Sequence, residues 1–213
     1  MSFTYDVTDG EFNIATSATL DLVAVEDNPY ADYAIQGTTE SDFLYGSFFR
    51  QISIFGNDGN DYILGGRRSD RLAGGDDNDW LSGWSGADLL NGDAGNDYLY
   101  GGSGADTLDG GSGLDHIWGG FGRDNFIFRE GNDVDIIEDF SQGGRGWSWW
   151  GWGRRSRGDT ITIDVNGVDS FDDLLELGAQ QGRNTVFDFG EGDQLIVDNT
   201  RLSHLGEDSF DFI

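Results

Sequence analysis

The chain of 213 residues contains no cysteine, no lysine and a single proline. Without cysteine it forms no disulfide, no thiolate metal site and no cysteine nucleophile. No apolar run approaches the roughly 18 to 20 residues that a membrane span needs. The first 30 residues carry six acidic residues and no basic one, which argues against a conventional secretory leader.

Positive charge is also scarce. Twelve arginines stand against 40 Asp and Glu residues, so the formal net charge is −28. Charge of this size repels itself in a compact state and disfavours nucleic acid or an anionic lipid surface as a partner. We therefore expect a bound cation, no nucleic acid and no membrane span.

What the chain has in excess is glycine, which is concentrated in a nine-residue repeat. Residues 56–127 hold 19 of the 35 glycines and divide into eight consecutive lines, from GNDGNDYIL to GGFGRDNFI. The first position is Gly, the sixth Asp and the eighth Ile, Leu or Phe in every line. An earlier line, GTTESDFLY from Gly37, fits the same frame, whereas 46–55 is one residue too long and has Gln51 or Ile52 where Asp is expected. A disordered Gly/Asp linker would not keep an apolar residue at the eighth position of every line.

These columns predict a solenoid. Glycine allows tight turns through positive φ, the sixth position supplies a hard oxygen ligand, and positions 7–9 form a short strand with one inward apolar side chain. Two lines then make one coil. The predicted core consists of the eighth-position residues Ile63, Leu72, Leu81, Leu90, Leu99, Leu108, Ile117 and Phe126. Because that core is thin, we expect the carboxylates to be neutralised and held by metal.

The lines resemble the GGxGxDxUx nonapeptide of repeats-in-toxin (RTX) proteins. The resemblance implies an all-β fold, a right-handed parallel β-roll with Ca²⁺ between successive turns, and oxygen-only ligands of the kind that suit calcium. The implied carboxylate ligands form two ladders, one of Asp42, Asp61, Asp79, Asp97 and Asp115 and the other of Asp70, Asp88, Asp106 and Asp124. The implied carbonyl ligands belong to Gly56, Asp58, Gly74, Asp76, Gly83, Ser85, Gly92, Ala94, Gly101, Ser103, Gly110 and Ser112.

The two ladders have seven gaps between neighbours, so at most about seven calcium ions are expected. Some turns depart from the repeat. Arg68 stands where a positive-φ glycine is expected and Trp84 replaces the second glycine of a later line, so we expect the site between Asp70 and Asp88 to be the weakest. Asn and Asp, which replace glycine at 57, 77 and 93, tolerate that geometry better.

The roll is predicted to have a cap at each end. Residues 1–36 are expected to form cap strands, 37–128 the roll, and 129–213 a mostly-β capping segment with one short helix. Strands are predicted over 126–128, 134–140, 160–165, 184–189 and 194–198. The helix follows Ser170 as its N-cap and ends at Gly178. This segment resembles those that end RTX proteins exported by type I secretion, which implies an extracellular location; the alternative is a plain cap with no role in export.

An insertion at 141–158 interrupts the capping segment. It holds Trp and Arg residues, which are enriched at binding hot spots. We expect partner contacts from Trp147, Trp149, Trp150, Trp152, Arg154 and Arg155. The partner would be a polysaccharide, a cell surface or a protein; the alternative is that the insertion folds back onto the acidic chain.

No catalytic residue is predicted. The chain has neither H-E-x-x-H nor G-x-S-x-G, and its carboxylate pairs are explained by metal ligation. His116 and His204 are expected to be packing or surface residues. We therefore expect a non-enzyme, either a calcium-dependent structural or adhesion module or a carbohydrate-binding accessory module resembling those of alginate epimerases.

Overall fold

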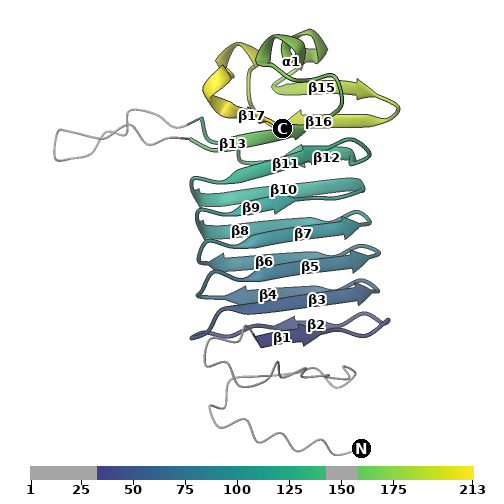
Figure 1. Cartoon of the computed structure of the whole chain (residues 1–213), viewed down its shortest axis with the longest axis vertical. Helices are drawn as coiled ribbons and strands as arrows, with labels where there is room; N and C mark the ends of the chain where they lie inside the picture. The colour runs from purple at the N-terminus through teal and green to yellow at the C-terminus, as the bar shows by residue number, and fades with distance from the viewer. Residues whose placement is uncertain (1–32, 143–157) are drawn as a thin grey trace, which may run out of the picture.

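The computed structural model describes residues 33–142 and 158–213, and it is a β-solenoid capped at its C-terminal end (Figure 1). The strands alternate between two sheets as the chain winds, so each strand pairs with the strand one coil before and one coil after it. The all-β parallel roll predicted from the sequence is confirmed. The N-terminal cap strands expected before residue 33 lie outside the described residues.

Sheet A has eight strands, all parallel to their neighbours: β1 (Tyr33–Gln36), β3 (Ile52–Asp58), β5 (Arg71–Asp76), β7 (Leu89–Ala94), β9 (Thr107–Asp109), β11 (Asn125–Arg129), β13 (Thr160–Asp164) and β17 (Phe210–Phe212). Sheet B has nine: β2 (Phe43–Tyr45), β4 (Tyr62–Gly66), β6 (Trp80–Ser85), β8 (Tyr98–Gly104), β10 (Gly113–Gly122), β12 (Asp133–Ile137), β16 (Asp193–Val197), β15 (Asn184–Gly190) and β14 (Gly178–Gln181). Strand β15 pairs antiparallel with both of its neighbours, β16 and β14. The described chain also has one α-helix, α1 (Phe171–Leu177), and the short 3-10 helices η1 (Leu202–His204) and η2 (Glu207–Ser209).

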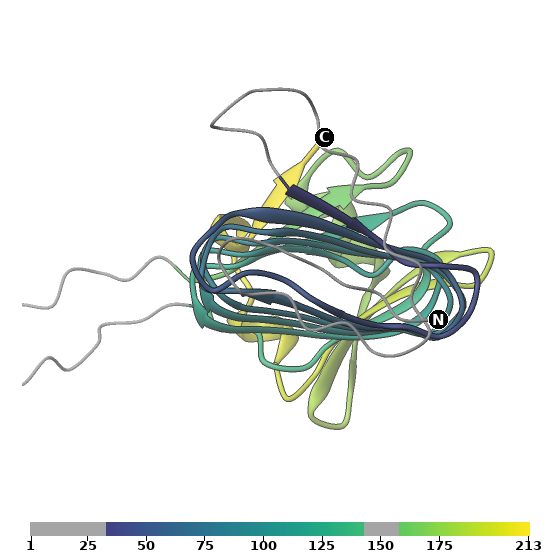
Figure 2. The same ribbon diagram turned by 90° about the horizontal axis from the view of Figure 1, so that it is seen from below.

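The two sheets face each other, as the view along the roll shows (Figure 2), and the apolar core lies between them. Residues 18 apart pair in register, for example Leu72 with Leu90 and Leu90 with Leu108. All eight eighth-position side chains are at most 2% exposed, so the predicted core is confirmed. Each strand contributes one of them because neighbouring side chains point to opposite faces.

The turns between the sheets form the two long edges of the roll. The first edge, where the chain passes from sheet A to sheet B, consists of residues 37–42, 56–61, 74–79, 92–97 and 110–115. The second edge, where it passes from sheet B to sheet A, consists of residues 46–51, 65–70, 83–88, 101–106 and 119–124.

Backbone geometry at the turns agrees with most of the sequence reading. Asn57, Asp77 and Asp93 adopt φ of 78°, 80° and 70°, as expected for side chains that tolerate the left-handed region. Trp84 has a φ of 71° and is the one aromatic residue in that region among those described. Arg68 differs: its φ is not positive, so the turn 65–70 takes another path from the other turns.

The C-terminal segment continues both sheets and closes the end of the roll. Strand β17 pairs with β13, and β16 pairs with β12. The predicted helix is confirmed, with the Asp173 amide donating to Ser170 Oγ at 3.3 Å. Gly178 ends it without a left-handed φ. That glycine matters because a Cβ there would lie 2.9 Å from the Phe187 ring.

Aromatic side chains stack along the outer face of sheet B. The Tyr62 and Trp80 ring centroids are 4.2 Å apart, and those of Tyr100 and Trp118 are 4.4 Å apart, with nearly parallel planes. His116 stacks on Tyr98 at 5.1 Å and its Nδ1 lies 2.6 Å from Glu138 Oε1. These cross-strand pairs stabilise neighbouring coils, and His116 is a packing residue.

Candidate calcium sites

The sixth-position aspartates form a ladder inside each edge of the roll. All nine are at most 3% exposed. On the first edge, the backbone amide of each Asp donates to Oδ1 of the Asp one coil further on: Asp42 to Asp61, Asp61 to Asp79, Asp79 to Asp97 and Asp97 to Asp115, at 2.7 to 2.8 Å. The second edge repeats this from Asp70 to Asp88, Asp88 to Asp106 and Asp106 to Asp124, at 2.7 to 2.9 Å. The two ladders predicted from the sequence therefore exist.

Segment 46–51 is the exception on the second edge. Ile52 takes the place of an aspartate, and its amide donates to Asp70 Oδ1 at 2.9 Å. The ladder on this edge therefore begins at Asp70, and the poor fit of residues 46–55 to the repeat is confirmed.

The other carboxylate oxygen of each aspartate is the feature that points to a cation. Oδ2 of Asp61 and of every later ladder residue through Asp124 is buried and has no hydrogen-bond partner among the described residues. In Asp42 the orphaned atom is Oδ1, because Thr38 donates to Oδ2. A buried carboxylate oxygen without a donor is costly unless a cation neutralises it.

Backbone carbonyls face these orphaned oxygens. A Cβ built on Gly92 would lie 2.3 Å from Asp97 Oδ2 and 2.2 Å from the Gly110 carbonyl oxygen, so the two oxygens converge on one point. The same convergence occurs at Gly56, Gly74, Gly83 and Gly101. Two acceptors that approach without a donor repel each other, and a hard cation between them removes the repulsion. The first-position carbonyls of Gly74, Gly83, Gly92, Gly101 and Gly110 each face a ladder carboxylate oxygen, and their role as calcium ligands stays a prediction.

The third-position residues have a different environment. Asp58, Asp76, Ala94 and Ser112 pair along one edge, and Ser85 and Ser103 pair along the other. The carbonyls of Ser103 and Ser112 accept from the amides of Gly86 and Gly95 at 2.9 Å. These carbonyls take part in the sheet ladder, and their role as ligands stays a prediction.

Sequence reasoning missed two carboxylates. Asp135 pairs with Asp115 in register, and its orphaned Oδ1 converges with Asp115 Oδ2 at Gly110, so it adds one neighbouring pair to the seven expected. Asp159 accepts from the amides of Asp124 and Ser141 at 3.0 and 2.8 Å, and it closes the second ladder with protein hydrogen bonds. Both break the 18-residue spacing, although each begins an Asp-x-apolar triplet, the signal that could have revealed them.

No group of three or more His, Asp or Glu side chains that could hold a metal occurs among residues 33–142 and 158–213. The candidate sites therefore depend on pairs of carboxylates supplemented by backbone carbonyls. Calcium accepts such mixed oxygen sets with six to eight ligands.

Burial raises the pKa of the ladder carboxyls. Desolvation raises the pKa of Asp97 to about 8 and those of Asp79 and Asp88 to about 7. The amide that donates to each Oδ1 opposes this rise, and neighbouring ladder carboxylates add to it. Without a cation, Asp97 of the folded roll therefore holds a proton at neutral pH, and Asp79 and Asp88 do so in part.

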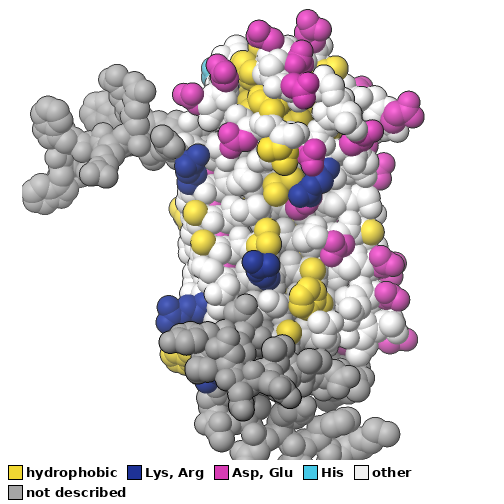
Figure 3. All heavy atoms as spheres, viewed as in Figure 1, with side chains coloured by type: hydrophobic (Ala, Val, Ile, Leu, Met, Phe, Trp, Pro, Cys, Tyr) yellow, Lys and Arg dark blue, Asp and Glu magenta, His cyan; other side chains and the backbone are white. Residues whose placement is uncertain are grey.

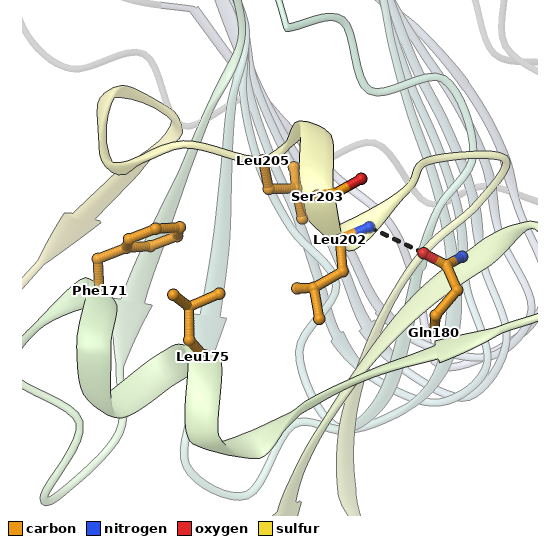
Figure 4. A pocket seen from close by; sticks show the side chains of 6 residues that line it. All are labelled: Phe171, Leu175, Gln180, Leu202, Ser203 and Leu205. Carbon is orange, nitrogen blue, oxygen red and sulfur yellow. Dashed lines mark hydrogen bonds between the residues drawn. The ribbon is translucent and has the colours of Figure 1, made fainter.

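The cap also contains an apolar hollow. It is lined by Phe171, Leu175, Gln180, Leu202, Ser203 and Leu205 (Figure 4). The Leu202 amide donates to Gln180 Oε1 at 2.9 Å across it. No titratable side chain lines it, so it offers no acid or base. The partner contacts expected from Trp147, Trp149, Trp150, Trp152, Arg154 and Arg155 lie outside the described residues.

Comparison with known proteins identifies the repeat. The family described as RTX calcium-binding nonapeptide repeat (4 copies) matches residues 53–67, 64–99 and 100–135. Residues 53–135 are RTX calcium-binding repeats. Most of the orphaned oxygens lie within these residues, and the family is described as calcium-binding. No curated protein matches the chain.

One solved structure similar to this chain is the extracellular lipase LipA from Serratia marcescens, with 18% identity and a TM-score of 0.46. The match covers 82% of this chain and 38% of the lipase, so the chain spans less than half the length of that protein. No helix in the described part of the RTX chain is long and apolar enough to cross a membrane.

The geometry predicts a rank among the sites. At Gly65 the corresponding distances to Asp70 Oδ2 and the Gly83 carbonyl are 2.9 and 3.1 Å, the loosest convergence of those compared. We expect Asp97→Ala to remove at least one calcium ion and to lower stability by at least about 1.4 kcal/mol more than Asp70→Ala at ten times the dissociation constant. Calorimetric calcium titration and thermal melting measure both, with the exposed Asp169→Ala as control. Equal losses at positions 70 and 97 would contradict the rank.

A second prediction concerns pH. The ladder carboxyls have folded pKa values above the ordinary 3.8, so the folded state binds more protons and, without calcium, its stability falls as pH rises from about 4 to about 8. Calcium needs the ionised form, so its affinity rises over the same range. Melting in chelator should therefore be highest at acidic pH, and melting in calcium highest at neutral pH. The same pH trend in both conditions would contradict this.

Proposed function

We propose that this chain is a secreted calcium-binding RTX protein whose roll folds on meeting extracellular Ca²⁺ and then serves as a structural or adhesion module. The observation that carries the proposal is the pair of buried carboxylate ladders. Each rung has one orphaned oxygen, and from Asp61 to Asp106 that oxygen faces a glycine carbonyl. These groups oppose folding when ionised and unpaired, and they favour it once calcium is bound.

Calcium concentration would decide the state of the roll. Sites of the extracellular type bind at about 10⁻⁴ to 10⁻³ M, far above the calcium level of the cytosol. At ten times its dissociation constant, each occupied site adds about 1.4 kcal/mol to stability. A few sites then supply an amount comparable to the whole stability of an ordinary domain, about 5 to 15 kcal/mol. Export of an unfolded chain followed by folding outside the cell fits this dependence.

The C-terminal segment supports the proposal through its position. Strand β17, within the closing residues 207–213, adds to the last strand of sheet A, and Phe210 packs against Phe171 and Phe187. We assign this segment two roles: it caps the roll after folding, and it carries the type I secretion signal before folding.

The first test is calcium-dependent folding of the full chain. We expect circular dichroism in chelator to show little strand structure, and millimolar Ca²⁺ to produce the strand spectrum reversibly. Magnesium at the same concentration is the control, because Mg²⁺ gives up its waters reluctantly and is seldom held by protein oxygens alone. An unchanged spectrum and melting temperature after chelation would refute the proposal.

The second test concerns the insertion at 141–158 as the contact surface of the module. Its base is fixed by the ladder: the Asp159 amide donates to the Ser141 carbonyl at 2.7 Å, and the Ser141 amide donates to Asp159 Oδ2 at 2.8 Å. We therefore expect replacement of 143–157 by a short Gly/Ser/Asp turn to leave calcium binding and melting nearly unchanged.

The same replacement should abolish attachment to a glycan, cell surface or protein partner. A glycan array with and without Ca²⁺ measures this, and it also tests the alternative function as a carbohydrate-binding accessory module. If the replacement unfolds the capping segment, the tryptophans belong to the core and the contact hypothesis is wrong.

A further inference from the structure

The two edges of the roll carry opposite charge. Apart from the buried ladder, the first edge contains five acidic side chains and no basic one: Glu40, Asp58, Asp76, Asp77 and Asp93. The second edge contains four arginines and no acidic side chain outside the ladder: Arg50, Arg67, Arg68 and Arg123. All nine are exposed. In the space-filling view, acidic side chains lie along one side of the roll, and basic ones lie on the other side and on the face between them (Figure 3).

The charged side chains of the two edges differ in what they contact within the described chain. None of the five acidic side chains forms an ion pair with a described residue, and neither do Arg67, Arg68 and Arg123. The Arg68 Nε donates to the Phe49 carbonyl at 3.3 Å, and the Arg67 guanidinium lies over the Phe48 ring at 4.1 Å. The second edge is therefore a cationic surface on which Phe48 and Phe49 position the two neighbouring arginines.

Exposed aromatic side chains also gather on the second edge. Phe48, Phe49, Trp84 and Phe121 are 39%, 65%, 51% and 84% exposed. Phe48 packs edge-to-face on Trp84 with centroids 5.0 Å apart. Trp84 lies between Gly66 and Gly102 in the sheet ladder, yet it holds the left-handed φ of those glycines. A bulky side chain in that region costs conformational energy, and such outliers concentrate at functional sites.

We propose that the second edge of one copy docks on the first edge of another copy of this chain. Charge complementarity selects this occupant: the arginines meet acidic side chains that already lie on the opposite side of the same molecule. The turn 65–70 lies between the turns 56–61 and 74–79 along the winding chain, so Arg67 and Arg68 are level with Asp58 and Asp77 within about one strand spacing, about 4.8 Å. A sideways translation of one roll therefore aligns the two edges.

This contact has a predictable symmetry. The two edges are different surfaces, so the interface is heterologous, and a translation does not close into a ring. Copies would therefore add side by side into open lateral arrays. The net charge of −28 opposes association at long range, but salt screens distant charges more than those in contact.

The test uses two variants that each neutralise one edge of the full chain. Arg67→Gln with Arg68→Gln removes two charges from the second edge, and Asp58→Asn with Asp77→Asn removes two from the first; Asn also suits the positive φ of Asp77. The matched control, Arg183→Gln with Arg201→Gln, removes two exposed arginines outside both edges. Circular dichroism and calcium stoichiometry first establish that every variant is folded.

Sedimentation velocity then measures association in saturating calcium. We expect the unmodified chain and the control to associate with rising concentration, and each edge variant to associate at least about tenfold more weakly. Raising salt from about 0.1 to about 1 M, which shortens the Debye length from about 10 to about 3 Å, should also weaken association. Mixing the two edge variants should restore pairs that stop at two, because each supplies one intact edge.

A variant of Trp84, the aromatic residue with a left-handed φ, tests the proposal independently. Trp84→Gly restores the residue type found at the paired positions 66 and 102, so we expect an unchanged or higher melting temperature together with weaker association. A strictly monomeric unmodified chain would overturn the proposal. Loss of association in the arginine variant alone would also overturn it, because the arginines would then bind an anionic surface other than the first edge. So would unchanged association in both variants.

Discussion

The roll depends on how its buried carboxylates are neutralised. Each rung after Asp42 satisfies one aspartate oxygen with a backbone amide from the neighbouring coil and leaves the other without a donor. The amides stack the coils and fix their 18-residue register, but they do not remove the charge. Desolvation shows the cost, since it raises the pKa of Asp97 to about 8. The same side chains therefore hold the coils together and, without a cation, drive them apart, which is the physical basis of the calcium-dependent folding that we propose.

The sequence was sufficient for those parts of the fold that repeat. Position six supplied both ladders and position eight supplied the core, because each column has one physical task that no other residue type performs there. The helix was predictable for a similar reason, since Ser170 caps it as its side chain allows. Prediction failed where the spacing changed. Asp135 and Asp159 belong to the ladders by register and hydrogen bonding, but they stand 20 and 35 residues after the previous rung.

Local departures from the repeat had different outcomes, and the difference lies in the backbone. Asn57, Asp77 and Asp93 replace glycine with little change because their short polar side chains accept positive φ. Arg68 does not, and its turn takes another path, which leaves the oxygens near Asp70 less convergent than those near Asp97. Trp84 keeps the glycine conformation against its own preference. Sequence alone identified all five residues as departures from the repeat. It could not predict whether each side chain would adopt the glycine conformation or the backbone would change its path.

Each coil of the roll contains two nine-residue lines, and the two lines differ in the side chains that their turns expose. Odd and even lines end on opposite edges, so substitutions at their turn positions change one edge and leave the other as it was. The lines from Gly56, Gly74 and Gly92 carry acidic turns, whereas the line from Gly65 carries Arg67 and Arg68 and the line from Gly83 carries Trp84. Calcium ligation constrains the glycines and the sixth position alike on both edges. In the docking that we propose, the turn positions outside calcium ligation determine which edge meets which, and they add a period of 18 residues to the period of 9.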